Sequence, residues 1–370
     1  MKKLDILCVI DDLTAGGAQR QLVNLALGLK SIGHDVSFLT YHKRTFYEQI
    51  LNDAGIKLIL IEEPNAIKRL LKFRRFIRNS NYTSIISFLG IPSFLASFAA
   101  FPCKNFNLVV GERSSNPKIK KSIKSQLIRL FYFKSDFIVA NSFSNIELVK
   151  SILPWISENK FKVIYNGLNL YKFHSSQDFK FKSNPRFTIV ITASYRRLKN
   201  LLGLIEAVQL LNKNDQDKLL IRWFGDKSPN GNHDDILENA IALIERYNLQ
   251  DVIQLNDATY EVAEKMKLAD AVGLFSFFEG LPNAICEGMA CGKPIIATKV
   301  SDVPLLIEDG VNGFICEANN PESISKSIRK LLSLNAQQLS LMGIQNRIKA
   351  EKLFDEITIT RAYEKLLIKK

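Results

Sequence analysis

FFEGLPNAICEGMACGKPI, residues 277–295, places Glu279 and Glu287 eight positions apart in a segment rich in glycine and proline. The segment follows AVGLF (271–275), which has the apolar composition of a buried strand. Residues 284–290 have the composition of a helix, so Glu279 is expected at a strand exit and Glu287 about one turn into the helix that follows. A strand, turn and helix in this order predict a parallel α/β architecture.

The same alternation of short apolar runs and longer amphipathic runs extends over the whole chain. Leu168–Pro185 has neither period and is rich in polar residues, so it divides the pattern in two. The strand-like runs are 4–10, 35–40, 57–62, 84–89, 107–112, 136–141 and 162–167 before it, and 186–194, 218–226, 252–256, 271–275, 293–298 and 313–317 after it. Strands separated by helices pair in parallel through right-handed crossovers. We therefore predict two doubly wound, Rossmann-like parallel-sheet domains facing each other across a cleft.

A chain of 370 residues is long enough for two such domains, each with its own core. We expect an N-terminal domain over 1–167, a linker over 168–185 and a C-terminal domain over 186–350. The last residues, 351–370, are expected to form a helix that packs back on the N-terminal domain. Ligands of doubly wound domains bind beyond the carboxyl ends of the strands.

The composition is that of a folded globular protein, with 46% hydrophobic and 24% charged residues. The five cysteines include no CxxC pair and none lies near a histidine at zinc-ligand spacing, which favours a reducing compartment. The apolar run 85–101 is short for a membrane span and contains Gly90 and Pro92. We expect it to form a buried strand, a turn and a helix.

The net charge of +13 is concentrated in one part of the chain. Between Ile67 and Lys134 there are fourteen lysines and arginines and one acid, Glu112. The segments 67–78 and 117–134 combine these cations with apolar residues at helical spacing, a pattern typical of helices that lie on an anionic membrane. Core-facing helices with a solvated basic face are the alternative. The segments contain no recognised nucleic-acid motif and no aromatic stacking platform, so we expect no nucleic-acid partner.

Two further loops have the composition of anion sites. In DDLTAGGAQR (11–20), Gly16 and Gly17 open a helix, where backbone amides and the helix dipole favour an anion. The loop is neither GxGxxG nor a P-loop, and a turn that needs glycine only for its geometry is the alternative. In ASYRRLKN (193–200), cations stand at a helix start, where they oppose the dipole unless an anion is bound. A solvated basic turn is the alternative there.

The quoted stretch continues this theme. Gly280, Leu281, Pro282 and Asn283 turn the chain and point backbone amides at a ligand. A carboxylate at the position of Glu287 accepts hydrogen bonds well from vicinal hydroxyls such as those of a ribose. The segment therefore favours a ligand with both phosphate and sugar groups.

The segment from Glu279 to Glu317 resembles the glutamate, seven residues, glutamate motif of the family 4 (group 1) retaining glycosyltransferases. The phrases GKPIIAT (292–298) and DGVNGF (309–314) follow in the order of that family. The glycine loop and the basic helix entry precede them in matching order, so the resemblance covers almost the whole chain. It implies the GT-B fold.

The resemblance also implies residue roles. Arg196 and Lys199 neutralise the diphosphate of a nucleotide sugar, and Gly16 and Gly17 approach it from the other domain. Glu279, with the amides of residues 280–283, holds the donor sugar, and Glu287 binds the ribose hydroxyls. The catalytic set is then Glu279, Arg196 and Lys199.

The implied reaction is a hexosyl transfer that retains configuration without a covalent enzyme intermediate. A departing phosphate oxygen takes the acceptor proton, so no strong protein base is required. No cofactor and no metal are expected, because arginine and lysine neutralise the leaving group. Asp215-Gln216-Asp217 is interpreted as a surface turn.

The chain departs from the family pattern at two places. Ala193-Ser194 stand where many relatives have Gly-Arg, so Arg196, or alternatively Arg197, supplies the cation. None of the four histidines lies in the N-terminal loop where many relatives place one near the sugar. That loop contains Glu112 and Arg113, which are candidates for contacting the sugar or the acceptor, with an internal ion pair at a strand end as the alternative.

We expect the donor to be a UDP-linked hexose or N-acetylhexosamine and the acceptor a glycan, in particular a lipid-linked sugar of capsule or lipopolysaccharide assembly. The enzyme is then cytoplasmic and peripheral on the inner face of the membrane, held by 67–78 and 117–134. The competing hypotheses are a nucleotide-sugar epimerase or hydrolase on the same fold, and a membrane or nucleic-acid binding module without chemistry.

Overall fold

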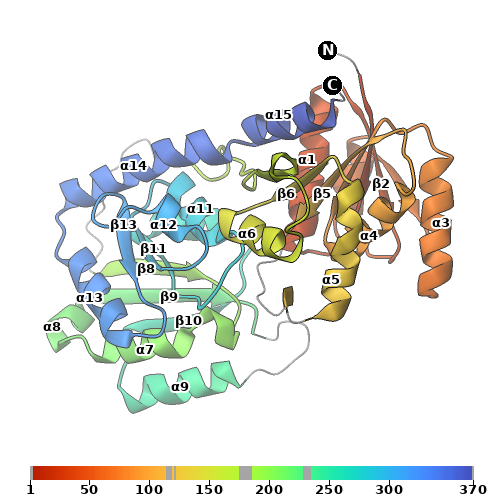
Figure 1. Cartoon of the computed structure of the whole chain (residues 1–370). Coiled ribbons are helices and arrows are strands. Elements are labelled where there is room, and N and C mark those ends of the chain that lie inside the picture. Colours follow the sequence, from red (N-terminus) through yellow and green to blue (C-terminus); the bar gives the residue numbers. More distant parts are fainter. Residues whose placement is uncertain (1–2, 114–118, 121, 175–185, 228–234, 369–370) are drawn as a thin grey trace. The chain divides into compact units, whose positions relative to one another are not determined.

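A computed structural model describes residues 3–113, 119–120, 122–174, 186–227 and 235–368 (Figure 1). The chain divides into two compact units. Unit 1 consists of Met1–Gly167 and Phe354–Lys370, and unit 2 of Leu168–Leu353. Each unit contains one fully parallel sheet with helices on both faces, so the predicted fold class is confirmed.

Unit 1 has a seven-stranded sheet of order β3-β2-β1-β4-β5-β6-β7. The strands are β1 Asp5–Val9, β2 Asp35–Thr40, β3 Lys57–Leu60, β4 Ser84–Phe88, β5 Asn107–Glu112, β6 Phe137–Ala140 and β7 Phe161–Val163. The helices are α1 Gly17–Ser31, α2 Glu48–Asp53, α3 Ala66–Arg78, α4 Gly90–Ala99, α5 Ile123–Leu130, η2 Phe131–Lys134, α6 Phe143–Ile152, η3 Glu158–Lys160 and α15 Glu356–Leu367.

Both faces of this sheet are buried, which explains the continuous apolar runs of its strands. In β1, Leu7 and Val9 face a core shared with α3, α4 and α6. Ile6 and Cys8 face the opposite core, shared with α1, α2 and α15. Successive side chains of a strand point to opposite faces, so a run without polar residues fits only a strand covered on both sides.

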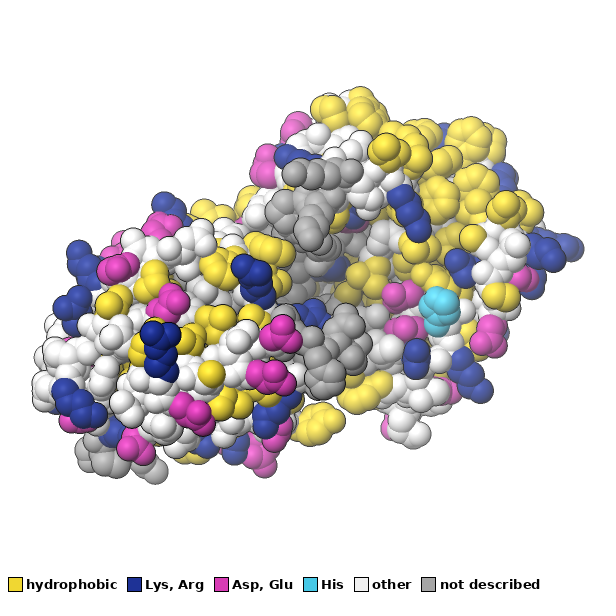
Figure 2. Space-filling view, turned by 90° about the horizontal axis from the view of Figure 1, so that it is seen from below, with side chains coloured by type: hydrophobic (Ala, Val, Ile, Leu, Met, Phe, Trp, Pro, Cys, Tyr) yellow, Lys and Arg dark blue, Asp and Glu magenta, His cyan; other side chains and the backbone are white. Residues whose placement is uncertain are grey.

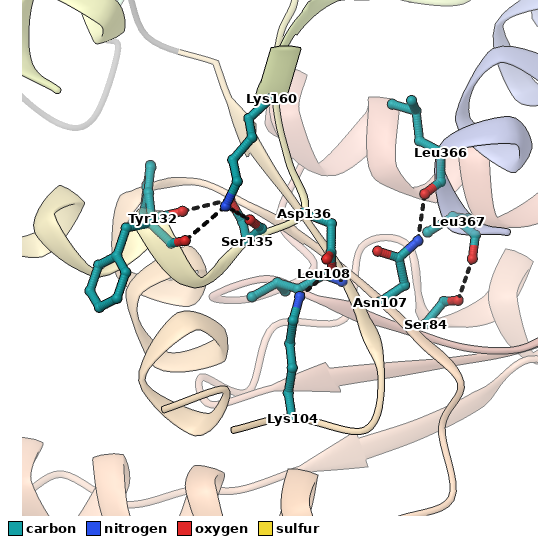
Figure 3. Close-up of polar contacts among 11 residues, drawn as sticks. Ser84, Lys104, Asn107, Leu108, Tyr132, Ser135, Asp136, Lys160, Leu366 and Leu367 are labelled. Carbon is teal, nitrogen blue, oxygen red and sulfur yellow. Dashed lines mark hydrogen bonds and ion pairs between the residues drawn. The ribbon is translucent and has the colours of Figure 1, made fainter. Parts of the chain in front are cut away.

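Helix α15 is the last element of unit 1 and packs against α1. Figure 3 shows its carboxyl end, where Ser84 Oγ donates to the Leu367 carbonyl at 2.9 Å and Asn107 Nδ2 donates to the Leu366 carbonyl at 2.5 Å. Ser84 and Asn107 begin two neighbouring strands, β4 and β5. Orphan carbonyls at the helix end are thereby satisfied by the sheet itself.

A buried histidine also contacts the last turn of this helix. His34 Nδ1 accepts from the Leu4 amide at 3.2 Å, and Nε2 lies 3.0 Å from Glu364 Oε1. A ring nitrogen that accepts an amide hydrogen carries no proton, so Nε2 carries it and donates to the carboxylate. Sequence reasoning expected a C-terminal helix on this domain, and these contacts are its physical basis.

Unit 2 has a six-stranded sheet of order β10-β9-β8-β11-β12-β13. The strands are β8 Phe187–Thr192, β9 Leu219–Gly225, β10 Ile253–Asp257, β11 Ala271–Leu274, β12 Ile295–Thr298 and β13 Gly313–Cys316. The helices are η4 Arg197–Lys199, α7 Leu201–Gln209, α8 Lys213–Asp217, α9 Ile236–Arg246, α10 Val262–Leu268, α11 Asn283–Ala290, α12 Val303–Leu306, α13 Pro321–Leu332 and α14 Ala336–Phe354.

Every strand predicted from the sequence forms, with ends shifted by at most a few residues. One small expectation is wrong: residues 215–217 belong to the short helix α8, which Asn212 caps through the Asp215 amide, and not to a turn. Most of the predicted linker, 175–185, and part of the predicted basic segment, 117–118 and 121, lie outside the described residues. Among the residues that are described, we find no helix both long and apolar enough to span a bilayer.

Two glycines of the 277–295 stretch have structural roles. A Cβ on Gly288 of α11 would lie 2.8 Å from Val272 Cβ of β11, so glycine is what allows this helix to approach its strand. Gly292 follows the helix with a φ of 66°, a left-handed conformation that glycine adopts without strain. Both residues shape the strand and helix around the two glutamates.

Replacing Gly288 by alanine is expected to lower the stability of the protein by about 1–3 kcal/mol, the usual cost of overpacking. Alanine is the better helix former by about 1 kcal/mol, so a net loss isolates the steric conflict. Thermal and urea unfolding of the full chain measure the effect. Gly17→Ala is the control, because a Cβ there meets nothing within 4 Å. Equal stability of Gly288→Ala and the wild type would contradict the packing argument.

Candidate functional site

The candidate site lies where the direction of the unit 2 sheet reverses. Strands β8 and β11 are neighbours, but the chain leaves β8 toward β9 and leaves β11 toward β12. Their two exit loops therefore diverge and leave a crevice at the carboxyl end of the sheet, the position at which doubly wound folds bind ligands. All three residues of the predicted catalytic set, Arg196, Lys199 and Glu279, are on these two loops.

The structure brings Lys199 and Glu279 together. Lys199 Nζ lies 2.5 Å from Glu279 Oε1, and Ser276 Oγ donates to the same oxygen at 2.6 Å. The lysine and glutamate side chains are 20% and 13% exposed, so the pair is sheltered but accessible to a solute. Two charge-assisted hydrogen bonds on one oxygen fix the position of the carboxylate at the crevice.

Backbone contacts hold the two loops against each other. The Phe277 amide donates to the Leu198 carbonyl at 3.0 Å. Thr298 Oγ1, at the end of β12, donates to the Ser276 carbonyl at 2.7 Å, and Ser301 Oγ donates to the Gly280 carbonyl. The exit of β11 is thus bonded on one side to the exit of β8 and on the other to that of β12.

The three cations of the β8 exit take different positions. Arg196 is partly exposed and precedes η4, and Lys199 ends η4 beside Glu279. Arg197 is exposed and lines a cavity of about 280 Å³ together with Asn200 and Phe277. The left-handed conformation of Asn200, with φ 59°, separates η4 from α7. Arg197 and Lys199 are two residues apart, but Arg197 faces this cavity and Lys199 faces Glu279.

Ala193 and Ser194, which replace the Gly-Arg of many relatives, are closely packed. Trp223 Nε1 donates to the Ala193 carbonyl at 2.7 Å. A Cβ on Gly225 would lie only 2.0 Å from the same carbonyl oxygen, so the ends of β8 and β9 approach each other as closely as glycine allows. Tyr195 completes the contact by donating to the Asn256 carbonyl at 2.8 Å.

The start of α11 carries the remaining predicted donor residues. Pro282 is the N-cap residue and Asn283 the first helical residue, with Gly280 partly exposed and Leu281 buried before them. Glu287 lies in the second turn and is only 6% exposed. Burial, followed by the charge of Glu287, raises the pKa of the neighbouring Cys286 thiol well above its usual range, so this cysteine is a neutral packing residue.

Gly16 and Gly17 occupy the corresponding reversal in unit 1, between β1 and β4. Side chains that sequence reasoning did not single out organise their loop. Asp11 Oδ1 accepts from the Asp12 amide at 2.9 Å, and Gln19 Nε2 lies 3.2 Å from an oxygen of each aspartate. Burial raises the pKa of Asp11. The glycines are therefore held by a small network of carboxylates and an amide at the start of α1.

Glu112 ends β5 inside the protein. It is 2% exposed, and its two oxygens accept from Arg129 Nη2 at 2.8 Å and from Tyr132 OH at 2.9 Å. Asn145 Nδ2 donates to its carbonyl at 3.1 Å. The internal ion pair that the sequence left open as an alternative is thus present, and a contact of Glu112 with a sugar or an acceptor stays a prediction.

Arg113 points to a different part of unit 1. Its guanidinium lies 3.7 Å from the ring centroid of Phe88, donates to Asn166 Oδ1 at 3.1 Å and also bonds the Tyr363 hydroxyl. These contacts tie the end of β5 to the last residues before the unit boundary and to α15. Substrate contact by Arg113 likewise stays a prediction.

The supporting residues Ser276, Thr298, Ser301, Asp11 and Gln19 were missed by sequence reasoning. Each is a polar residue at or just beyond the end of a predicted apolar strand, or just inside the next helix, and that position was the available signal. Ser276, Asp11 and Gln19 bond residues of their own loops. Thr298 and Ser301 bond carbonyls of a different loop, which no spacing rule connects to them.

Two parallel α/β units, with an acid and a base paired at a reversal point, define a protein of the GT-B glycosyltransferase fold. The family model for Glycosyltransferase Family 4 matches residues 15–172, and that for Glycosyl transferases group 1 matches residues 174–348. The chain belongs to the group 1, family 4 glycosyltransferases, and the resemblance found in the sequence is confirmed.

Similar proteins agree with this assignment. The chain is 26% identical, over 100% of both chains, to N-acetylgalactosamine-N,N'-diacetylbacillosaminyl-diphospho-undecaprenol 4-alpha-N-acetylgalactosaminyltransferase of Campylobacter jejuni. It is also 26% identical to N,N'-diacetylbacillosaminyl-diphospho-undecaprenol alpha-1,3-N-acetylgalactosaminyltransferase of the same organism, over 86% of this chain and 88% of the relative. The structure of Anabaena HepE in complex with UDP matches with a TM-score of 0.85 at 18% identity, over 98% and 99% of the two chains.

Arg129→Met is expected to destabilise the protein by about 3 kcal/mol or more, because it leaves the Glu112 charge buried without its partner. Adding Glu112→Gln removes the charge, and most of the lost stability should return. Urea unfolding of the two single variants and the double variant measures the coupling. Strictly additive effects would contradict a direct pair. Sugar transfer by the folded double variant then tests substrate contact separately: full turnover leaves Glu112 with a structural role alone.

Proposed function

We propose that this glycosyltransferase moves a sugar, with retention of configuration, from a UDP-linked hexose or N-acetylhexosamine to a hydroxyl of a lipid-linked glycan. The product belongs to cell-surface polysaccharide assembly, as in capsule or lipopolysaccharide. The observation that carries the proposal is the Lys199–Glu279 pair at the reversal point of the unit 2 sheet, beside the start of α11.

Relatives support both substrates. The names of the two Campylobacter enzymes describe transfer of N-acetylgalactosamine to sugars on diphospho-undecaprenol, a lipid-linked acceptor. Anabaena HepE, which has the same fold, has been crystallised with UDP and with UDP-glucose. A UDP-sugar donor and a lipid-linked acceptor are therefore the first substrates to test.

In this proposal Lys199 and Arg196 bind the diphosphate, and Glu279 holds a hydroxyl of the donor sugar. Lys199 and Glu279 are hydrogen-bonded to each other in the structure. Donor binding therefore exchanges one ion pair for two contacts, lysine to phosphate and carboxylate to sugar. Ser276 and Thr298 keep the carboxylate in place during this exchange, because their bonds do not involve the lysine.

The remaining donor contacts come from the start of α11, from Glu287 and from the glycine loop before α1. The amides of Gly280, Leu281 and Asn283, at the start of α11, face the sugar and the phosphate, and Glu287 accepts hydrogen bonds from the ribose. Gly17 supplies a backbone amide to the same donor, and Gly16, whose own amide donates to the Thr14 carbonyl at 2.8 Å, lets the main chain approach the donor closely. The buried position of Glu287 suits this role, since a carboxylate there has few water molecules to lose when hydroxyls bind.

The chemistry needs charge stabilisation more than a protein base. The bond between the anomeric carbon and the phosphate oxygen breaks, and its electron pair leaves with UDP. The acceptor oxygen attacks the same face of the sugar, and its proton passes to the leaving phosphate oxygen. Arg196 and Lys199 stabilise the developing diphosphate charge, so we propose a reaction that requires no metal.

Glu279→Gln and Lys199→Ala are expected to change UDP binding in opposite directions. Glu279→Gln removes a carboxylate that competes for Lys199, so UDP should bind several-fold more tightly, in line with about 1 kcal/mol for a sheltered ion pair. Lys199→Ala removes a cation, so UDP should bind more weakly. Both variants should lose about 10²–10³-fold in turnover. Calorimetry with UDP and a radiolabelled transfer assay provide the two readouts.

Lys227→Ala is the matched control, because Lys227 pairs with Asp257 on the surface of the same unit. If UDP affinity fell equally in Glu279→Gln and Lys199→Ala, the exchange of partners would be wrong. If both variants kept full turnover, the assignment of the site itself would be wrong.

The stereochemical outcome tests retention directly. Proton NMR of the first product formed from an α-linked UDP-sugar should show an α-linkage, and a β-linkage would contradict a retaining reaction. Chelation with EDTA should leave the initial rate unchanged, because the cations of the β8 exit replace a metal. A rate that disappears with EDTA and returns with Mg²⁺ or Mn²⁺ would contradict metal independence.

A further inference from the structure

Helix α5 exposes its apolar face. Ile123, Leu127 and Leu130, spaced to share one face of the helix, are 75%, 55% and 38% exposed. The opposite side of the helix carries Arg129, which is buried against Glu112. The apolar face formed by these three residues is thus turned outward.

This apolar face continues into an aromatic cluster. The ring of Phe131 in η2 lies 5.3 Å from that of Phe94, 5.7 Å from that of Phe98 and 6.5 Å from that of Phe101. Phe101 and Phe133 are 43% and 42% exposed. We call Ile123, Leu127, Leu130, Phe101 and Phe133 the α5 strip. In Figure 2 hydrophobic side chains gather on the side of unit 1, with lysines and arginines at their margin.

Two lysines support the aromatic end of the strip. Lys134 donates to the Pro102 carbonyl at 2.8 Å, with its ammonium 5.2 Å from the ring centroids of both Phe101 and Phe133. Lys160 donates to the Phe133 carbonyl at 2.9 Å. It also donates to the Ser135 carbonyl at 2.8 Å, as Figure 3 shows.

The sequence segment 67–134, which contains the strip, has fourteen lysines and arginines and one acid. Glu112 is the only acid between Ile67 and Lys134, and it is buried in an ion pair. Every carboxylate of this segment is therefore hidden, whereas Lys68, Arg75, Lys120 and Lys124 are exposed. A surface that is apolar in the middle and cationic at its edge matches the acyl boundary and the anionic headgroups of a bilayer.

The contribution of α3 differs from the sequence expectation of two similar basic helices. Arg74 donates to the Phe98 carbonyl at 2.8 Å and to that of Phe101, and Arg78 donates to the Cys103 carbonyl at 2.9 Å. These two arginines thus satisfy carbonyls at and beyond the end of α4, and Phe73 and Ile77 enter the core. Helix α3 still exposes Ile67 and Leu71, at 70% and 55%, beside its cations, and the aromatic cluster belongs to α4 and η2.

We propose that the α5 strip docks unit 1 on an anionic lipid bilayer. This inference deepens the proposed function, because it rests on a lipid-linked acceptor and names the surface that meets the membrane. A second copy of the chain fits less well, because a symmetric contact would place two surfaces of like charge against each other. A nucleic acid would use the cations and leave the apolar strip exposed to water.

The test is flotation of the full-length protein with vesicles of phosphatidylcholine, with and without phosphatidylglycerol. The wild type should float only with the anionic vesicles. Ile123→Ser/Leu127→Ser should reduce binding by roughly tenfold or more, the effect of removing a few buried methylene groups. Lys120→Glu/Lys124→Glu should reduce it comparably at low salt and less at high salt. Leu341→Ser on α14 is the control, since Leu341 is 54% exposed against 55% for Leu127.

The outcomes separate this inference from the proposed function. Loss of flotation in the strip variants, with the UDP-induced thermal shift retained, supports docking even if no sugar transfer is ever found. Equal flotation of the strip variants and the wild type overturns it. So does a wild type that ignores anionic vesicles and forms a dimer that Leu127→Ser dissociates, or one that binds duplex DNA regardless of the strip.

Discussion

One backbone hydrogen bond, from the Phe277 amide to the Leu198 carbonyl, joins the two loops on which the candidate site of this glycosyltransferase is built. Strand exits diverge at a reversal point, so nothing in the sheet itself keeps these loops together. The bond fixes their separation, and the Lys199–Glu279 pair follows from that separation. Thr298 and Ser301 add support from one side only, at and after the end of β12, and Ser276 bonds Glu279 within the loop itself. The site thus depends on a contact between main-chain atoms that are almost eighty residues apart.

The chain contains two acid–base pairs of similar length whose surroundings give them opposite uses. Glu112 and Arg129 are 2% and 6% exposed, and Tyr132 satisfies the second oxygen of the carboxylate. A pair so completely buried and bonded cannot open without leaving a charge in an apolar interior. Glu279 and Lys199 are 13% and 20% exposed, so an incoming anion can compete for the lysine at modest cost. Access to solvent, and not the residue types, distinguishes the buried pair from the pair that we propose to exchange partners.

The fold and the outline of the site could be predicted from the sequence, because both are written in local patterns. Continuous apolar runs identify strands covered on both faces, and residues 277–295 identify a strand exit followed by a helix. The supporting contacts could not be predicted in the same way. Thr298 reaches a carbonyl on the neighbouring strand, and Gly288 is required because Val272 lies against it. Such pairings depend on sheet order, and spacing along the chain contains no information about which strand lies next to which.

Helix α5 shows a second limit of pattern reading. A periodic apolar stripe indicates that a helix has an apolar face, but the period is the same whether that face meets the core or an external partner. Here the side of α5 that faces the protein is occupied by Arg129, which Glu112 and the Ser125 carbonyl hold at the end of β5. With an arginine directed inward, the apolar stripe has no room in the core and turns to the surface. The orientation of α5 therefore accounts for both features. It buries Arg129 in an ion pair with Glu112, and it leaves the apolar residues of the α5 strip on the surface.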